Sequence, residues 1–198
     1  MATKKIGTKD LLGVERVQKL DLMAHLIANL QNTLILRGDK GIGKTTLLTV
    51  ALSRDMSDTD MLLLNATHDL SFESIQYELV EFINEKYQLD SRVIADILAS
   101  YEKQGKKLVL LIDDAGLLIT GLMNALINYA NKHPALRIIF ALTPEEFELK
   151  HDIEGLNQHC HFIELLELNY EQSEVFIRQL VDVGQTQYLD KDITESLL

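Results

Sequence analysis

The stretch from Gly38 to Thr45 reads Gly-Asp-Lys-Gly-Ile-Gly-Lys-Thr, which satisfies every position of the phosphate-binding pattern G-x-x-x-x-G-K-[ST]. An apolar, partly β-branched run at 33–37 precedes it, and a run suited to a core-facing helix follows at 46–52. Strand, loop and helix in this order are the context that the pattern requires. The sequence therefore predicts an α/β domain whose loop holds the phosphates of a nucleoside triphosphate.

The chemistry of phosphate binding explains the composition of this loop. Its glycines let backbone N–H groups converge on phosphate oxygens at distances that side chains would prevent. Lys44 is expected to reach the β- and γ-phosphates, and the Thr45 hydroxyl to hold Mg²⁺. The helix that begins here points the positive end of its dipole at the anion. The predicted nucleotide-binding residues are Gly38, Asp39, Lys40, Gly41, Ile42, Gly43, Lys44, Thr45 and Thr46.

A second element follows at 107–114, where a continuous apolar run ends in two carboxylates. It resembles a Walker B strand. Asp113 is expected at the carboxyl end of a parallel strand, beside the phosphate loop, where it would hold Mg²⁺ through the water shell of the ion. Asp114 is then the candidate general base or water-positioning residue. The alternative is an Asp-Asp turn that merely ends a strand.

The rest of the chain alternates between strand and helix patterns, which predicts a three-layer αβα fold with a five-stranded parallel sheet. Ser91 is expected to cap the fourth helix, and Gly105 to end it. We expect a nucleotide-binding domain over 1–167. The start of a helical lid is expected over 168–198, truncated within its second helix. The expected strands are 33–38, 61–66, 107–113, 137–142 and 160–165, and the expected helices 14–30, 44–54, 72–87, 91–105 and 118–132.

Composition narrows the function further. The 198 residues are 46% hydrophobic, and no run approaches the length of a membrane span. The N-terminus lacks the apolar region of a signal peptide, and Cys160 is the only cysteine, so we expect a reducing cytoplasm. A formal net charge of −11 disfavours general nucleic-acid binding. The basic cluster Lys103, Lys106 and Lys107 is interpreted as a helix C-terminus.

Both nucleotide motifs, with a fourth strand ending in polar Thr143, resemble the AAA+ branch of P-loop ATPases. This resemblance implies that Thr143 is the sensor-1 residue. The patterns at 20–26, 144–145 and 168–172 resemble the ExeA/GspA and MshM secretion ATPases, and still more the ATPase domain of DamX-type cell-division proteins. The likeness covers about residues 10–185. It implies ATP, Mg²⁺, protein partners in an envelope or division complex, and a full-length protein that often adds a transmembrane helix and a SPOR domain.

Three departures from the AAA+ pattern predict slow hydrolysis. Asp114 stands where these ATPases usually carry Glu, so its carboxylate is one methylene shorter. Residues 143–165 contain no arginine finger and offer only Lys150 and histidines as cations. The truncated lid lacks a sensor-2 arginine, and Arg178 is interpreted as a solvated helix residue.

The expected function is therefore an ATP-dependent switch with slow or conditional ATPase activity. A nucleotide-dependent homo-oligomer stays open, and the missing arginine counts against a ring. A nucleotide-independent scaffold and a DNA-transposition or helicase-loader ATPase remain as alternatives. Two further features have simple structural interpretations beside a functional one. Asn65 could orient the catalytic water or cap the turn that follows it. Glu145, Glu146 and Glu148 form an acidic run that is interpreted as a solvated loop or a helix N-terminus.

Overall fold

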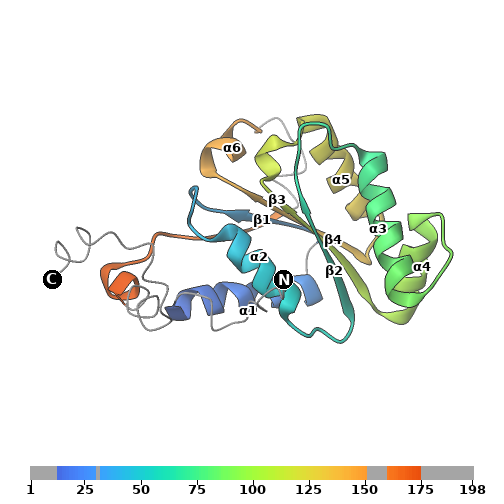
Figure 1. The fold of residues 1–198 in the computed structure, drawn as a ribbon, viewed down its shortest axis with the longest axis horizontal. Helices are drawn as coiled ribbons and strands as arrows, with labels where there is room; N and C mark the ends of the chain where they lie inside the picture. The colour runs from blue at the N-terminus through green and yellow to red at the C-terminus, as the bar shows by residue number, and fades with distance from the viewer. Residues whose placement is uncertain (1–12, 30–31, 151–159, 175–198) are drawn as a thin grey trace, which may run out of the picture.

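Five parallel strands form one sheet in the order β2-β3-β4-β1-β5. The computed structural model describes residues 13–29, 32–150 and 160–174 (Figure 1). Each of the four pairs of neighbouring strands is parallel. The predicted fold class is confirmed. The strands are β1 (Thr33–Arg37), β2 (Thr59–Asn65), β3 (Lys107–Asp113), β4 (Leu136–Leu142) and β5 (Cys160–Glu164).

Helices cover both faces of this sheet, as Figure 1 shows. The first two helices pack on one face and the next three on the other. None of the helices in the described ranges has the length and hydropathy needed to cross a bilayer. The helices are α1 (Gly13–Asn29), α2 (Lys44–Ser53), α3 (Phe72–Tyr87), α4 (Ile94–Gln104), α5 (Thr120–Lys132) and α6 (Pro144–Glu148), with a 3₁₀ turn, η2 (Ala115–Leu117), after β3.

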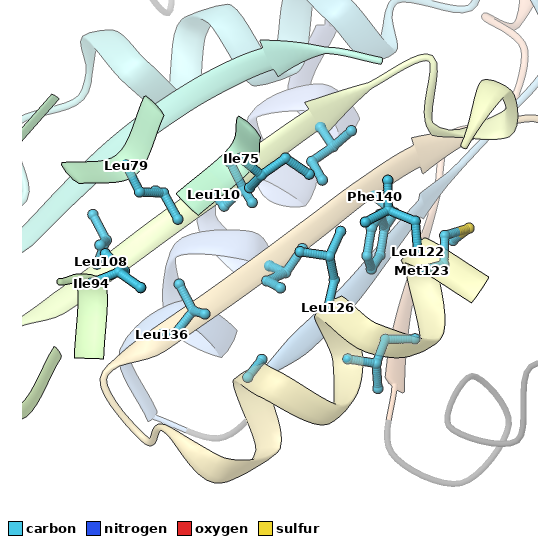
Figure 2. Packing of buried hydrophobic residues seen from close by; sticks show 14 of the residues in the cluster. Ile75, Leu79, Ile94, Leu108, Leu110, Leu122, Met123, Leu126, Leu136 and Phe140 are labelled. Carbon is cyan, nitrogen blue, oxygen red and sulfur yellow. The ribbon is translucent and has the colours of Figure 1, made fainter. Parts of the chain in front are cut away.

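Alternation along the buried strands divides the core into two layers. On β3, Leu108 and Leu110 face α3, α4 and α5, while Val109 and Leu111 face α1 and α2. Figure 2 shows the first of these layers, where Leu126 of α5 lies among strand residues such as Phe140. Central strands buried on both faces read as continuous apolar runs, which explains why the sequence pattern located them.

The order of the strands decides which chain segments meet at the carboxyl edge. β4 lies between β1 and β3, so the residue after β4, Thr143, comes between the phosphate loop after β1 and Asp113 at the end of β3. Ligand sites of open parallel sheets lie at this edge. The edge therefore gathers the predicted functional residues from three separate stretches of sequence.

One local expectation about a helix start is wrong. Ser91 does not cap α4; its backbone N–H and C=O instead pair with the side chain of Asn84, and Val93 is the N-cap residue. The helix expected from about 118 begins at Thr120, after the turn η2 and an extended Ile119. By contrast, Gly105 ends α4 in a left-handed conformation, with φ of 70°, as expected.

Candidate functional site

A hollow of about 550 Å³ opens at the carboxyl edge of the sheet, within the size range of small-molecule sites. It is lined by loop residues, by two carboxylates and by Thr143. Among the predicted nucleotide-binding residues, Gly38, Asp39 and Ile42 belong to the frame of the loop and do not line the hollow. The lining residues are Lys40, Gly41, Gly43, Lys44, Thr45, Thr46, Asp114, Leu117, Thr143 and Glu146.

The loop wraps around the side chain of Lys44. Gly41 and Gly43 have φ of 80° and 102°, a left-handed region that other residues adopt at a cost. This path brings two carbonyl groups onto the Lys44 ammonium: Nζ donates to Gly38 O at 2.6 Å and to Asp39 O at 2.9 Å. Lys44 is buried. The loop thus holds a cation at its centre. Phosphate oxygens could take the place of the two carbonyl oxygens as hydrogen-bond partners of this ammonium group.

The phosphate loop and the Walker B strand are joined directly. Thr45 Oγ1 donates a 2.6 Å hydrogen bond to Asp113 Oδ2, although the two residues are far apart in sequence. Asp113 is buried, and its other oxygen, Oδ1, accepts the backbone N–H of Asp114 at 3.1 Å. A hydroxyl and a carboxylate in contact offer the kind of oxygen ligands that Mg²⁺ prefers.

Asp114 has a strained backbone, with φ of 50° and ψ of 36°. Aspartate tolerates this left-handed region better than most residues, and such conformations are frequent at functional sites. The turn directs the exposed Asp114 side chain to the wall of the hollow. Within the described ranges its carboxylate has no hydrogen-bond partner. The residue therefore lies where a water-positioning group is expected, with its carboxylate available.

Position 38 requires glycine because Leu165, the residue that follows β5, lies close to its Cα. A Cβ added to Gly38 would lie 2.9 Å from the backbone O of Leu165 and 2.8 Å from Ile42 Cγ2. We expect Gly38→Ala to lower the free energy of unfolding by about 1–3 kcal/mol, the usual cost of overpacking. Gly121→Ala is the matched control, since an added Cβ meets nothing within 4 Å there. Urea unfolding of both variants tests this, and equal stabilities would contradict it.

Thr143 lies at the N-cap of α6 and contributes to the hollow. Glu146, three residues later, lines the same hollow. Glu145 and Glu146 lie in the first turn of α6, as the helix N-terminus interpretation expected, but the Glu146 side chain is half-buried, whereas Glu145 and Glu148 are exposed. The spacing Thr-x-x-Glu is a capping-box pattern and could have indicated this arrangement. Asn65 pairs in register with Asp113 but does not line the hollow.

Lys150 is not available as a substitute for an arginine finger. It is buried, and its Nζ donates to the backbone O of Leu118 at 2.6 Å. Burial lowers the pKa of Lys150, and the nearby charge of Glu146 opposes that shift. An ammonium group held inside its own domain cannot reach across a subunit boundary. Arg178 lies outside the described residues.

The residues of this site fit Mg²⁺ with a nucleoside triphosphate. Glycines at left-handed φ angles leave the loop open, with no atom within 4 Å of an added Cβ at Gly41 or Gly43. Lys44, Thr45 and Asp113 have the charge and the oxygen atoms that would hold a Mg²⁺–triphosphate. A second hollow, of about 450 Å³, is lined by residues of α3, by the stretch 91–95 and by Tyr129. Among the described residues, Arg92 is its one cation, the carboxylates Glu73 and Glu81 line it too, and it has no glycine loop.

The geometry agrees with the comparison to protein families. A family model described as an AAA domain matches residues 27–150, which include the phosphate loop, Asp113, Asp114 and Thr143. The chain belongs to the AAA domain family. Membership makes it an AAA-type P-loop ATPase domain and implies nucleotide binding, typically with Mg²⁺. No curated protein matches the sequence.

Solved structures share the fold of this AAA domain at low sequence identity. A Walker-type ATPase of Pyrococcus abyssi is 13% identical, with a TM-score of 0.67, over 100% of this chain and 65% of that chain. Cdc6p from Pyrobaculum aerophilum is 16% identical, with a TM-score of 0.57, over 92% of this chain and 52% of that chain. Drosophila ORC bound to DNA is 16% identical, with a TM-score of 0.64, over 92% and 52%. The chain thus spans between half and two thirds of these structures.

Proposed function

We propose that this AAA domain binds Mg·ATP through Lys44, Thr45 and Asp113 and acts as a nucleotide switch. The observation that carries the proposal is the 2.6 Å contact between Thr45 Oγ1 and Asp113 Oδ2 at the wall of the hollow. It joins the phosphate loop to the carboxylate of β3, as Mg²⁺ coordination requires. Adenine is preferred over guanine on the AAA+ resemblance, and no N/T-K-x-D guanine signature follows β4.

Hydrolysis in this proposal is slow. Thr143 occupies the position between the loop and Asp113 that suits a residue sensing the terminal phosphate. Asp114 has a side chain one methylene shorter than the usual Glu, and the Lys150 ammonium donates its hydrogen bond to the Leu118 carbonyl. Without an added cation, electrostatic stabilisation of the transferring phosphoryl group is weaker. A partner or a homo-oligomer that supplies the missing cation would make the ATPase activity conditional.

The cellular setting follows from the resemblance to ExeA/GspA, MshM and DamX-type domains. We assign the domain to the cytoplasmic side of a bacterial division or secretion assembly, with protein partners and a helical lid that begins near residue 168. A capping box supports the lid: Asn169 Oδ1 accepts the N–H of Gln172, and Gln172 Oε1 accepts that of Asn169.

A calorimetric titration of Mg·ATP into the chain, with GTP as competitor, tests the nucleotide switch. Saturable binding that GTP does not displace is the expected result. Absence of binding by a folded chain would instead favour a nucleotide-independent scaffold.

A helicase-loader ATPase is the second candidate, because one similar structure is described as bound to DNA. The net charge of −11 opposes this role. We expect no retention on a DNA column at about 0.15 M salt, a concentration at which phosphate contacts still hold specific DNA-binding proteins. Retention that decreases steeply with salt would revive this candidate.

A further inference from the structure

Glu146 is held against Thr143 by two reciprocal hydrogen bonds. Its carboxylate Oε2 accepts the backbone N–H of Thr143 at 2.8 Å, and its own N–H donates to Thr143 Oγ1 at 3.2 Å. Both residues are half-buried and both line the hollow beside the phosphate loop. The capping box of α6 is therefore part of the wall of the candidate ATP site.

On its other side Glu146 packs on the turn that follows Asp113 and Asp114. A Cβ added to Gly116 would lie 2.2 Å from Glu146 Cδ and 2.5 Å from Oε1. No side chain other than hydrogen fits at this position while Glu146 stays in place. Glu146 thus bridges the ends of β3 and β4, between the turn that carries Asp114 and the residue Thr143.

These contacts fix the direction in which the Thr143 hydroxyl can act. Because Oγ1 accepts the N–H of Glu146, one lone pair is occupied and the side-chain rotamer is set. Within the described part of the chain, the hydroxyl proton has no acceptor. It is free to donate to an oxygen anion in the hollow, and such charge-assisted hydrogen bonds are stronger than neutral ones.

We propose that Glu146 is a positioning residue, which orients the Thr143 hydroxyl as a donor to the terminal phosphate of ATP and ties it to the turn that carries Asp114. The inference rests on the proposed binding of ATP at this site. It assigns Glu146 a role beyond that of a helix cap. The capping box of α3, formed by Ser71 and Ser74, is the structural counterpart that does not line the hollow.

The test compares the dissociation constants of Mg·ADP and Mg·ATP, because ADP lacks the phosphate that Thr143 would contact. We expect the wild-type chain to prefer ATP. Glu146→Ala keeps the backbone N–H that donates to Thr143 Oγ1, but it removes the carboxylate that holds the Thr143 N–H and packs on Gly116. Thr143 is then no longer held in place, and we expect the preference to fall about tenfold, the effect of one lost hydrogen bond from its hydroxyl to the charged phosphate. Gly116→Ala displaces the Glu146 carboxyl and should act in the same direction. Glu146→Gln keeps an oxygen that accepts the Thr143 N–H and should retain the preference.

Two controls separate positioning from stability. Ser74→Ala removes the matching side-chain half of the α3 capping box, and Gly121→Ala adds a Cβ that meets nothing within 4 Å. Both should keep the wild-type ratio of the two constants, whatever their melting temperatures. An unchanged ratio in Glu146→Ala, a loss in Glu146→Gln equal to that in Glu146→Ala, or a wild-type chain that binds both nucleotides equally would overturn the inference. A wild-type chain that binds neither would overturn the proposed function itself.

Discussion

Lys44→Ala is expected to weaken Mg·ATP binding by about 3 kcal/mol, or roughly 100-fold, the loss of a strong hydrogen-bonded charge contact. Lys44 is the buried cation at the centre of the loop. Its bonds to Gly38 O and Asp39 O hold it in place, and phosphate oxygens are stronger partners for it than these carbonyl groups. Calorimetric titration of the variant against the wild type measures this loss.

Lys40→Ala is the matched control for this change. Lys40 belongs to the same loop and lines the same hollow, but its side chain is exposed. Exposed charges are screened by water and salt, so we expect less than about a tenfold effect. Equal losses in the two variants would mean that the loop attracts nucleotide by general charge, without the specific contact that Lys44 makes.

Asp60→Asn is expected to have the largest effect on stability, about 3 kcal/mol, because it removes a buried charge to which three side chains donate hydrogen bonds. Asp60 is 4% exposed. Its carboxylate accepts hydrogen bonds from Lys86 Nζ, from the Tyr101 hydroxyl and, at 2.8 Å, from the Tyr87 hydroxyl. An amide in its place loses the charge and turns an N–H toward these donors.

Denaturant unfolding measures this loss, and Tyr87→Phe is the control, since it removes a single hydrogen bond and should cost about 1 kcal/mol. Asp60 lies at the amino end of β2, at the opposite edge of the sheet from the phosphate loop. Folded Asp60→Asn should therefore keep the wild-type affinity for Mg·ATP. An unfolding free energy within 1 kcal/mol of wild type would contradict the expected role of the cluster.

The same carboxylate predicts an acid dependence of stability. Burial raises the pKa of Asp60, but its hydrogen bonds from Lys86, Tyr101 and Tyr87 outweigh burial and leave that pKa below the usual value. A lowered pKa contributes stability above the pKa of the unfolded chain, about 3.9, and loses it as pH falls through the folded value. Wild-type stability should decrease below about pH 4, and less steeply in Asp60→Asn.

The local elements were predictable because their causes are local. The buried runs of β3 and β4 and the apolar periodicity of α3 lie within continuous stretches of sequence, and the observed bounds lie within two residues of those expected. Helix starts were less predictable. Ser91 has good capping chemistry, but Asn84 of the preceding helix occupies its backbone groups instead.

By itself the sequence determined the phosphate loop, its flanking strand and helix, and the carboxylates after β3, because each is a contiguous pattern with its own chemistry. The tertiary structure alone decided what faces the hollow. Placing β4 between β1 and β3 brings Thr143 and Glu146 beside the turn at Gly116, and buries Lys150 against Leu118. These contacts join residues about thirty positions apart, and no spacing rule predicts them, since they depend on strand order.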